Sequence, residues 1–316
     1  MLYNIKKPFA IHQIKQDNHT IYFEEYGNAK GIPVVFLHGG PGSGCNEGQK
    51  AIFDYKKYRV IFMDQRGSGK STPRGSLKNN TTLRLIDDIE FVRKYLKIES
   101  WVVVGGSWGA TLALAYAQAH TFKVEAMLLR ALFLGTKKEI DWAFFGAPLK
   151  FRPELIYRLN DFLNNKKIIN PIFTLGEMLE SKNKKIRILG ANLWLAYESN
   201  LSTIKFNYEN FNDALSDTSK EKKLLPNTPF VEWHYIKNNF FLKPNQLLKC
   251  KNKLSKIPIS IIQSDYDLLC PPQTSFNFAS GLPKCKVFRI ASAGHYISDP
   301  GVKEMMKLLL DEYERI

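Results

Sequence analysis

The stretch Gly105-Gly106-Ser107-Trp108-Gly109 follows the apolar run Trp101–Val104 and leads into a helical pattern that begins at Ala110. It spells G-x-S-x-G between a strand and a helix, which is the setting in which this pattern marks a nucleophile elbow. Small residues flank the serine because the tight turn strains its backbone. The hydroxyl then stands at a helix N-terminus, where N–H groups and the helix dipole stabilise an anion. The stretch predicts a catalytic Ser107; an idle serine in a glycine-rich turn is the alternative.

Apolar strands and helical patterns alternate on both sides of this turn. The expected strands are Ala10–Gln16 and Thr20–Tyr26, which form a hairpin, and then Pro33–Leu37, Tyr58–Met63, Trp101–Val104, Val124–Leu129, Ile257–Gln263 and Lys286–Ile290. Helices are expected at Thr81–Leu96 and from Gly301 to Glu314. Continuous apolar strands separated by helices predict an α/β fold, with a mostly parallel sheet covered on both faces.

The alternation stops after Leu134 and returns at Ile257. Residues 136–245 carry helical stripes, aromatic residues and proline breaks, but no strand pattern. A helical stretch inserted between two parts of one sheet is typical of a cap. We therefore expect a core formed by residues 1–135 and 246–316, and an inserted helical cap formed by residues 136–245.

The composition of the 316 residues narrows the class of protein. No apolar run reaches the roughly 18 residues that a membrane span needs, and the first residues lack the apolar region of a signal peptide. The four cysteines are scattered without a C-x-x-C pair, which predicts a cytoplasmic protein without disulfides or a metal site. The net charge is +15, but the basic residues stand in short groups without interleaved aromatics. We expect no nucleic-acid or membrane partner; the oligomeric state stays unknown.

A serine nucleophile needs a base, and the base needs an acid that holds its tautomer. Asp265 and Asp267 follow one downstream strand, and His295 follows the last strand. These positions give the chain order serine, acid, histidine, at strand ends where parallel sheets carry their active sites. We predict a triad of Ser107, Asp267 and His295, and prefer Asp267 to Asp265 because it lies further from its strand. A helix cap for the acid and a surface loop for the histidine are the alternatives.

An oxyanion needs two backbone N–H donors. One is expected at Trp108, directly after the serine, and the other at Gly40 in the loop His38–Gly44, whose glycines allow a close approach to substrate. Phosphate binding is disfavoured, because the loop lacks the lysine of a P-loop and a complete G-x-G-x-x-G. Asp64 and Arg66, in the loop after the next strand, are expected to hold loops beside the site.

Several motifs together resemble those of the proline iminopeptidase family of α/β-hydrolases. They are His38-Gly39-Gly40-Pro41-Gly42, Asp64-Gln65-Arg66-Gly67, Gly105-Gly106-Ser107-Trp108-Gly109 and Gly294-His295. The resemblance runs from about residue 20 to the C-terminus. It implies an α/β-hydrolase core with a helical cap, removal of an N-terminal proline from short peptides, and no metal or cofactor. It also implies that Ser107, Asp267 and His295 are nucleophile, acid and base.

The resemblance further implies that two cap glutamates bind the free amine of the substrate. Trp194–Glu198 is similar to the W-x-x-W-E segment of the family and Val231–Tyr235 to its E-N-H-Y segment, which assigns Glu198 and Glu232. Buried carboxylates suit an ammonium group, whereas a surface glutamate paired with a lysine is the alternative for each. Phe133 is expected to pack against the proline ring.

The chain departs from the family at Ala143, where an aromatic residue is usual after a tryptophan of the early cap. Either the proline pocket is wider here or Phe144 replaces that aromatic ring. We therefore expect a serine aminopeptidase that prefers proline. The alternatives are a general esterase or amidase with broader acyl specificity, and a non-catalytic binding protein on the same scaffold.

Overall fold

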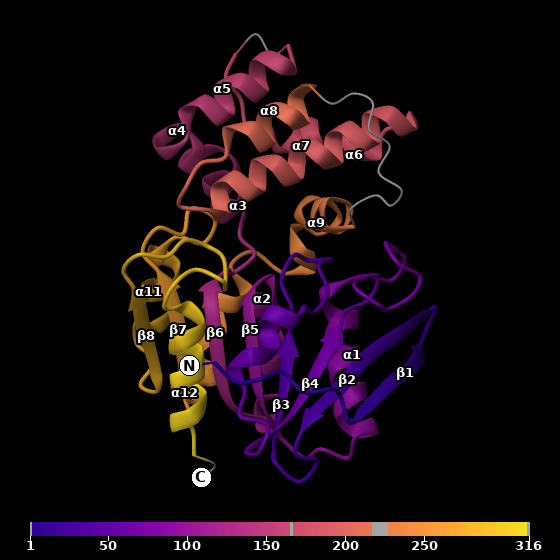
Figure 1. Cartoon of the computed structure of the whole chain (residues 1–316), viewed down its shortest axis with the longest axis vertical. Coiled ribbons are helices and arrows are strands. Elements are labelled where there is room, and N and C mark those ends of the chain that lie inside the picture. The colour runs from indigo at the N-terminus through magenta and orange to yellow at the C-terminus, as the bar shows by residue number, and fades with distance from the viewer. Residues whose placement is uncertain (1, 165–166, 217–226, 315–316) are drawn as a thin grey trace.

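The computed structural model describes residues 2–164, 167–216 and 227–314. In this part of the chain, one sheet has the strand order β1-β2-β4-β3-β5-β6-β7-β8 (Figure 1). The strands are β1 (Ala10–Gln16), β2 (His19–Gly27), β3 (Ile32–Leu37), β4 (Tyr58–Asp64), β5 (Trp101–Ser107), β6 (Val124–Leu132), β7 (Ile259–Ser264) and β8 (Cys285–Ile290). β2 pairs antiparallel with β1 and β4, and the other pairs are parallel. The predicted hairpin and mostly parallel sheet are confirmed.

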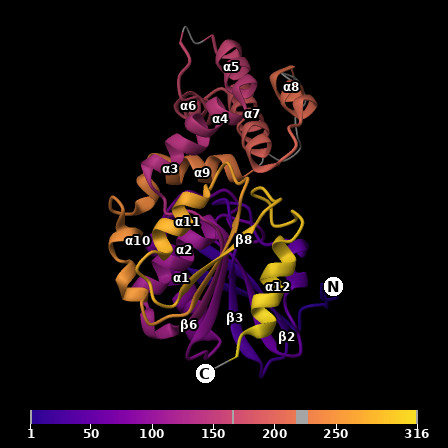
Figure 2. The ribbon, with the colours of Figure 1, turned by 90° about the vertical axis from the view of Figure 1, so that its left-hand side faces the viewer.

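Helices cover both faces of the sheet (Figure 2). One face packs against α1 (Thr82–Tyr95), α2 (Trp108–Ala119) and α11 (Pro272–Ala279), and the other against α12 (Val302–Glu312) and the 3-10 turn Glu47–Ile52. Strand β3 shows why its sequence is continuously apolar: Val35 and Leu37 enter the core of the first face, and Val34 and Phe36 enter that of the second. Thr81 caps α1, because its side chain accepts a hydrogen bond from the backbone N–H of Arg84.

The stretch from Lys137 to Lys237, between β6 and β7, is mostly helical, and its described residues lie beyond one end of the sheet (Figure 1). It contains α3 (Lys137–Asp141), a π-helical turn (Trp142–Gly146), α4 (Ala147–Phe151), α5 (Pro153–Phe162), α6 (Ile172–Glu180), α7 (Lys184–Ser202), α8 (Tyr208–Ser216) and α9 (Thr228–Lys237). The short elements Asn239–Phe241, α10 (Gln246–Lys249) and Lys251–Leu254 pack against the core beside the sheet, and the short turn Thr121–Lys123 precedes β6. No described helix is long and apolar enough to cross a membrane.

Helix α9 joins the sheet to the helices α3 to α8, which are called the upper helices here. Val231 and Tyr235 belong to the apolar core beside the sheet, whereas Trp233, on another face of the same helix, belongs to the core formed by the upper helices. The division into a core of residues 1–135 and 246–316 and a cap of residues 136–245 stays a prediction, and residues 165–166 and 217–226 of that cap lie outside the described residues.

Candidate active site

Strand β5 ends at Ser107 and α2 begins at the next residue, so the serine sits on the predicted turn. Its backbone has φ 56° and ψ −126°, a conformation that side-chain-bearing residues rarely adopt. A Cβ placed at Gly105 would lie 2.4 Å from the carbonyl oxygen of Gly109, and one placed at Gly109 would lie 2.1 Å from that of Leu37. The turn is therefore tight enough to require the two glycines that flank the serine in the motif.

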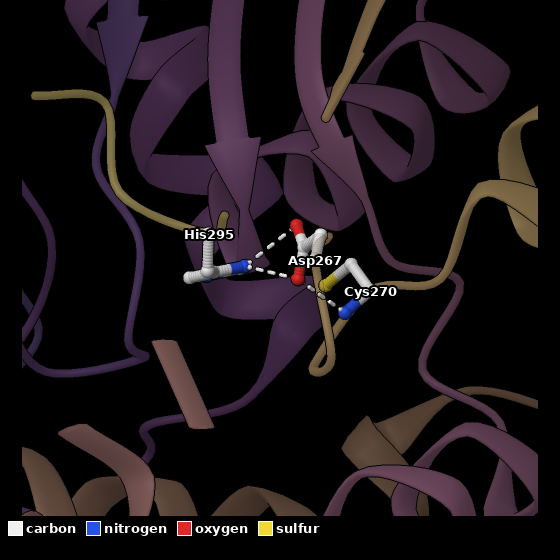
Figure 3. Close-up of side chains that lie close together, drawn as sticks. All are labelled: Asp267, Cys270 and His295. Carbon is white, nitrogen blue, oxygen red and sulfur yellow. Dashed lines mark hydrogen bonds and ion pairs between the residues drawn. The ribbon is translucent and has the colours of Figure 1, made fainter. Parts of the chain in front are cut away.

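His295, in the loop after β8, contacts Asp267, in the loop after β7 (Figure 3). The Nδ1 of His295 lies 3.0 Å and 2.9 Å from the two carboxylate oxygens of Asp267. An ionised carboxylate only accepts hydrogen bonds, so Nδ1 carries the proton and donates it. The other ring nitrogen, Nε2, is then left with a lone pair, which is the form of histidine that acts as a base.

The carboxylate of Asp267 is fully buried and held by its own loop. Its Oδ1 accepts hydrogen bonds from the backbone N–H groups of Leu269, at 3.1 Å, and Cys270, at 2.8 Å. Asp265 instead forms an ion pair with Arg289 on the outer strand, with Nε and Oδ1 2.9 Å apart. The structure thus places Asp267, and not its competitor Asp265, against the histidine.

Ser107 and His295 line one cleft of about 690 Å³. Ser107 also lines a small side pocket together with Cys270, whose thiol is buried. Burial raises the pKa of this thiol well above its ordinary value, and the nearby carboxylate of Asp267 raises it further, so the thiol stays neutral. One carboxylate oxygen of Asp267, the sulfur of Cys270 and one ring nitrogen of His295 all lie within 4.8 Å of one another. Asp267, Cys270 and His295 therefore form one cluster, and Ser107 lines the same cleft as His295.

The loop after β3 passes directly beside the serine, because a Cβ placed at Gly39 would lie 3.6 Å from the Cβ of Ser107. Gly40 has φ 106° and lines the cleft. The loop is anchored by the buried side chain of His38, whose Nε2 accepts a 3.0 Å hydrogen bond from the backbone N–H of Gln65. Burial lowers the pKa of His38, which keeps its imidazole neutral.

The side chain of Gln65 links this loop to the elbow. Its Oε1 accepts a 2.8 Å hydrogen bond from the indole N–H of Trp108, and its Nε2 donates a 2.8 Å hydrogen bond to the carbonyl oxygen of His38. Both predicted oxyanion donors, at Gly40 and Trp108, are thus on backbone segments that one glutamine side chain ties together.

Two acidic side chains, one from α7 and one from α9, enter the same cleft. Glu198 lies on α7 and Glu232 on α9, and the two carboxyl groups are close enough that the charge of Glu198 raises the pKa of Glu232. The Nε1 of Trp194 donates a 2.7 Å hydrogen bond to Oε2 of Glu232, which is 5% exposed. Burial raises the pKa of both carboxyls, and the neighbouring Glu198 raises that of Glu232 further. The pair therefore holds a proton that isolated glutamates would lose.

An apolar side pocket of about 50 Å³ opens beside Ser107 and the two glutamates. Phe133 lines it, as do both candidates for its opposite wall, Ala143 and Phe144. The ring of Phe144 is buried and stacks on that of Tyr197, with centroids 6.2 Å apart. The residues predicted for ring binding are thus in place around one small apolar space.

Two residues of this region are missing from the predictions made from sequence. Arg130 lies near the end of β6, lines the cleft and donates a hydrogen bond to the carbonyl oxygen of His295. A Cβ at Gly106 would lie 2.9 Å from its Nη2, so that glycine leaves room for the guanidinium. A basic residue within an apolar strand was the signal available for Arg130. Phe240, in the turn after α9, lines the side pocket with no comparable signal.

Comparison with known proteins places the chain in a family. Residues 32–302 match the α/β hydrolase fold family. The proline iminopeptidase of Arabidopsis thaliana is 36% identical over 98% of this chain and 83% of that protein, and the one of Neisseria gonorrhoeae is 33% identical over 96% of each.

Solved structures agree on the fold. A proline iminopeptidase-related protein from Thermus thermophilus superimposes with a TM-score of 0.62 at 19% identity, over 96% of both chains. A haloalkane dehalogenase variant from Bradyrhizobium elkanii gives a TM-score of 0.66 at 16% identity, over 96% of this chain and 95% of that one. At such low sequence identity, these two structures show only that the fold is shared. The family match over residues 32–302 and the curated relatives show that the chain belongs to the proline iminopeptidase family of α/β-hydrolase fold proteins.

Proposed function

We propose that this protein is a serine aminopeptidase that releases an N-terminal residue, preferentially proline, from short peptides. One observation carries the proposal: the carboxyl pair of Glu198 and Glu232 lies in the same cleft as Ser107 and His295. An acyl-transfer site beside a buried acidic pair is suited to a substrate whose scissile carbonyl lies next to a positively charged amine. The relatives named proline iminopeptidases support this substrate class.

The acidic pair supplies amine recognition. Burial raises the pKa of both carboxyls, so an ammonium group that binds beside them supplies the positive charge that buried carboxylates need. The pyrrolidine ring of proline then lies in the side pocket against Phe133, next to Ser107. This places the first peptide carbonyl at the nucleophile, and the rest of the peptide extends into the cleft.

The triad carries the chemistry. Ser107 gives up the proton of its hydroxyl to Nε2 of His295 and attacks the carbonyl carbon. Asp267 keeps Nδ1 protonated and stabilises the imidazolium. The N–H groups of Gly40 and Trp108 bind the oxyanion.

Collapse of the tetrahedral intermediate releases the shortened peptide. The C–N bond breaks as His295 protonates the leaving amine, and an acyl-enzyme remains on Ser107. Water, deprotonated by His295, then hydrolyses the ester and frees the amino acid. No step draws on a metal or cofactor. Helices α7 and α9 enclose the amine end of the substrate, which favours short cytoplasmic peptides over folded proteins, nucleic acids or membranes as partners.

The test compares a prolyl-arylamide, its N-acetylated form and an acetyl ester on the purified protein. We expect the free-amine substrate to be hydrolysed much faster than the other two, and Ser107→Ala to hydrolyse none of them at an unchanged melting temperature. Equal hydrolysis of the acetyl ester and the prolyl-arylamide would identify a general esterase. A fluorophosphonate probe should label Ser107, and absence of that adduct would identify a non-catalytic binding protein.

A further inference from the structure

The turn after α9 has an unusual backbone. Asn239, Phe240 and Phe241 have φ values of 50°, 55° and 52°, so three consecutive residues with side chains adopt the left-handed conformation. Bulky residues avoid this region because their Cβ approaches the following carbonyl oxygen. Such a conformation persists only where the surrounding structure imposes it, and it concentrates at functional sites.

The ring of Phe240 is held from several sides. It is 2% exposed, stacks on Trp108 at a centroid distance of 5.8 Å and meets Phe133 edge-on at 5.0 Å. A Cβ placed at Gly135 would lie 3.3 Å from the ring, so the glycine makes room for it. The carbonyl oxygen of Phe240 accepts a hydrogen bond from the hydroxyl of Thr82 on α1. The ring therefore cannot swing aside to enlarge its surroundings.

This ring lines the side pocket together with Phe133 and Ser107. Ala143 contributes only a methyl group to the same pocket. On the basis of the proposed function, we propose that Phe240 is a specificity-determining residue that sets the depth of the side pocket. Its immobile ring admits a side chain of the size of a pyrrolidine and excludes larger N-terminal residues by steric overlap. The left-handed turn is the backbone conformation that presents this ring to the pocket.

Phe241 provides a matched control. It has the same residue type and nearly the same φ, but its ring packs on His234 and Tyr235, at 5.2 Å and 5.4 Å. It is not among the described residues that line the side pocket. Glycine at either position relieves the left-handed backbone and removes one phenyl ring, so the two variants differ mainly in whether the pocket is deepened.

The experiment measures kcat/KM for prolyl-, leucyl- and phenylalanyl-arylamides with the native enzyme, Phe240→Gly and Phe241→Gly. We expect the leucyl-to-prolyl ratio to rise about tenfold or more in Phe240→Gly and to stay within about threefold in Phe241→Gly. An unchanged ratio in Phe240→Gly, or an equal change in both variants, would overturn the proposal.

Loss of a buried ring could prevent Phe240→Gly from folding, which a melting curve shows. Phe240→Leu is the second variant, because it keeps an apolar side chain while shortening the wall. Its ratio should rise about threefold, and an unchanged ratio there also overturns the proposal. If the native enzyme cleaves arylamides but the leucyl-to-prolyl ratio does not change in the variants, only the role of Phe240 is refuted. Native enzyme that cleaves none of them refutes the aminopeptidase function and this inference together.

Discussion

The carboxyl groups of Glu198 on α7 and Glu232 on α9 line the cleft that holds Ser107, close enough that the charge of Glu198 raises the pKa of Glu232. Two neighbouring buried carboxyls resist being ionised together, because like charges repel strongly where water is excluded. Burial raises the pKa of both groups and so favours their protonated forms. The pair is therefore poised to exchange one proton for the ammonium group of a substrate.

Replacing one member of the pair should weaken amine recognition without touching the nucleophile. We expect Glu232→Gln to raise KM for prolyl-arylamide at least about thirtyfold, because a buried ammonium would lose a charged partner. Hydrolysis of an N-blocked activated ester, which reaches Ser107 without a free amine, should change less than about threefold. Steady-state kinetics on both substrates checks this. Equal effects on the two substrates would remove Glu232 from amine recognition.

The same pair should make the protein less stable as the pH rises. The folded state keeps a proton on the pair above the ordinary glutamate pKa of 4.5, whereas the unfolded chain releases it. Between pH 4.5 and the raised pKa of the folded protein, the free energy of unfolding therefore falls by up to about 1.4 kcal/mol per pH unit for each proton involved.

Glu232→Gln isolates this effect from other titrating groups. Its thermal stability relative to the native protein should increase from pH 5 to pH 8, because glutamine has no proton to lose. Melting temperatures of both proteins at the same series of pH values provide the measurement. Parallel curves over that range would show that the pair does not hold the proton.

Most of the sheet could be predicted, because buried parallel strands have a plain signature. Val34 and Val35 face opposite helical layers, so no polar residue interrupts the strand. The placement of Ser107, Asp267 and His295 could be predicted because Ser107 ends a strand, the other two stand in the loops that follow strands, and parallel strands bring such ends together.

Other parts of the site depend on contacts that a linear pattern does not contain. The contact of Glu198 with Glu232 joins two helices whose mutual packing follows from the tertiary fold. Phe240 adopts a left-handed φ that its neighbours impose, whereas sequence signals for that region rest on glycine and asparagine. Helix α9 belongs to both sides of the predicted cap boundary. Tyr235 packs in the core beside the sheet, whereas Trp233 packs in the core formed by the upper helices.

Asp267→Asn should reduce kcat by about 10³- to 10⁴-fold with little change in melting temperature. The backbone N–H groups of Leu269 and Cys270 would hold the amide oxygen in the place of Oδ1, which turns the amide NH₂ toward His295. Nδ1 must then accept a hydrogen bond, so the proton moves to Nε2 and the base is lost. Asp265→Asn is the control and should keep kcat within about twofold, since that residue pairs with Arg289. Similar losses in both variants would contradict the assignment of the acid.

Arg66 and Asp88 offer a test of what holds the loop after β4. The Nε of Arg66 lies 2.5 Å from Oδ2 of Asp88, and the two side chains are 1% and 0% exposed. Nη2 donates a second hydrogen bond, at 2.7 Å to Oδ1, so the pair is bidentate. Asp88→Asn would remove the buried carboxylate that faces the guanidinium of Arg66. Among the described residues, the remaining carboxylate partner would be Asp17, whose side chain is 36% exposed. We expect the free energy of unfolding in urea to fall by about 3–5 kcal/mol.

The control for this loss is the exposed pair of Lys137 and Asp141, whose side chains are 76% and 44% exposed. Asp141→Asn should cost less than about 1 kcal/mol, because water screens the pair. Arg66 and Asp88 do not line the cleft formed by the described part of the chain, so the kcat/KM of the folded Asp88→Asn variant should stay close to native. A stability loss no larger than that of the control would mean that the loop is held by Asp64 instead. The carboxylate of Asp64 accepts hydrogen bonds from the backbone N–H groups of Cys45 and Lys70, at 2.7 Å and 2.8 Å, and so spans both loops beside the serine.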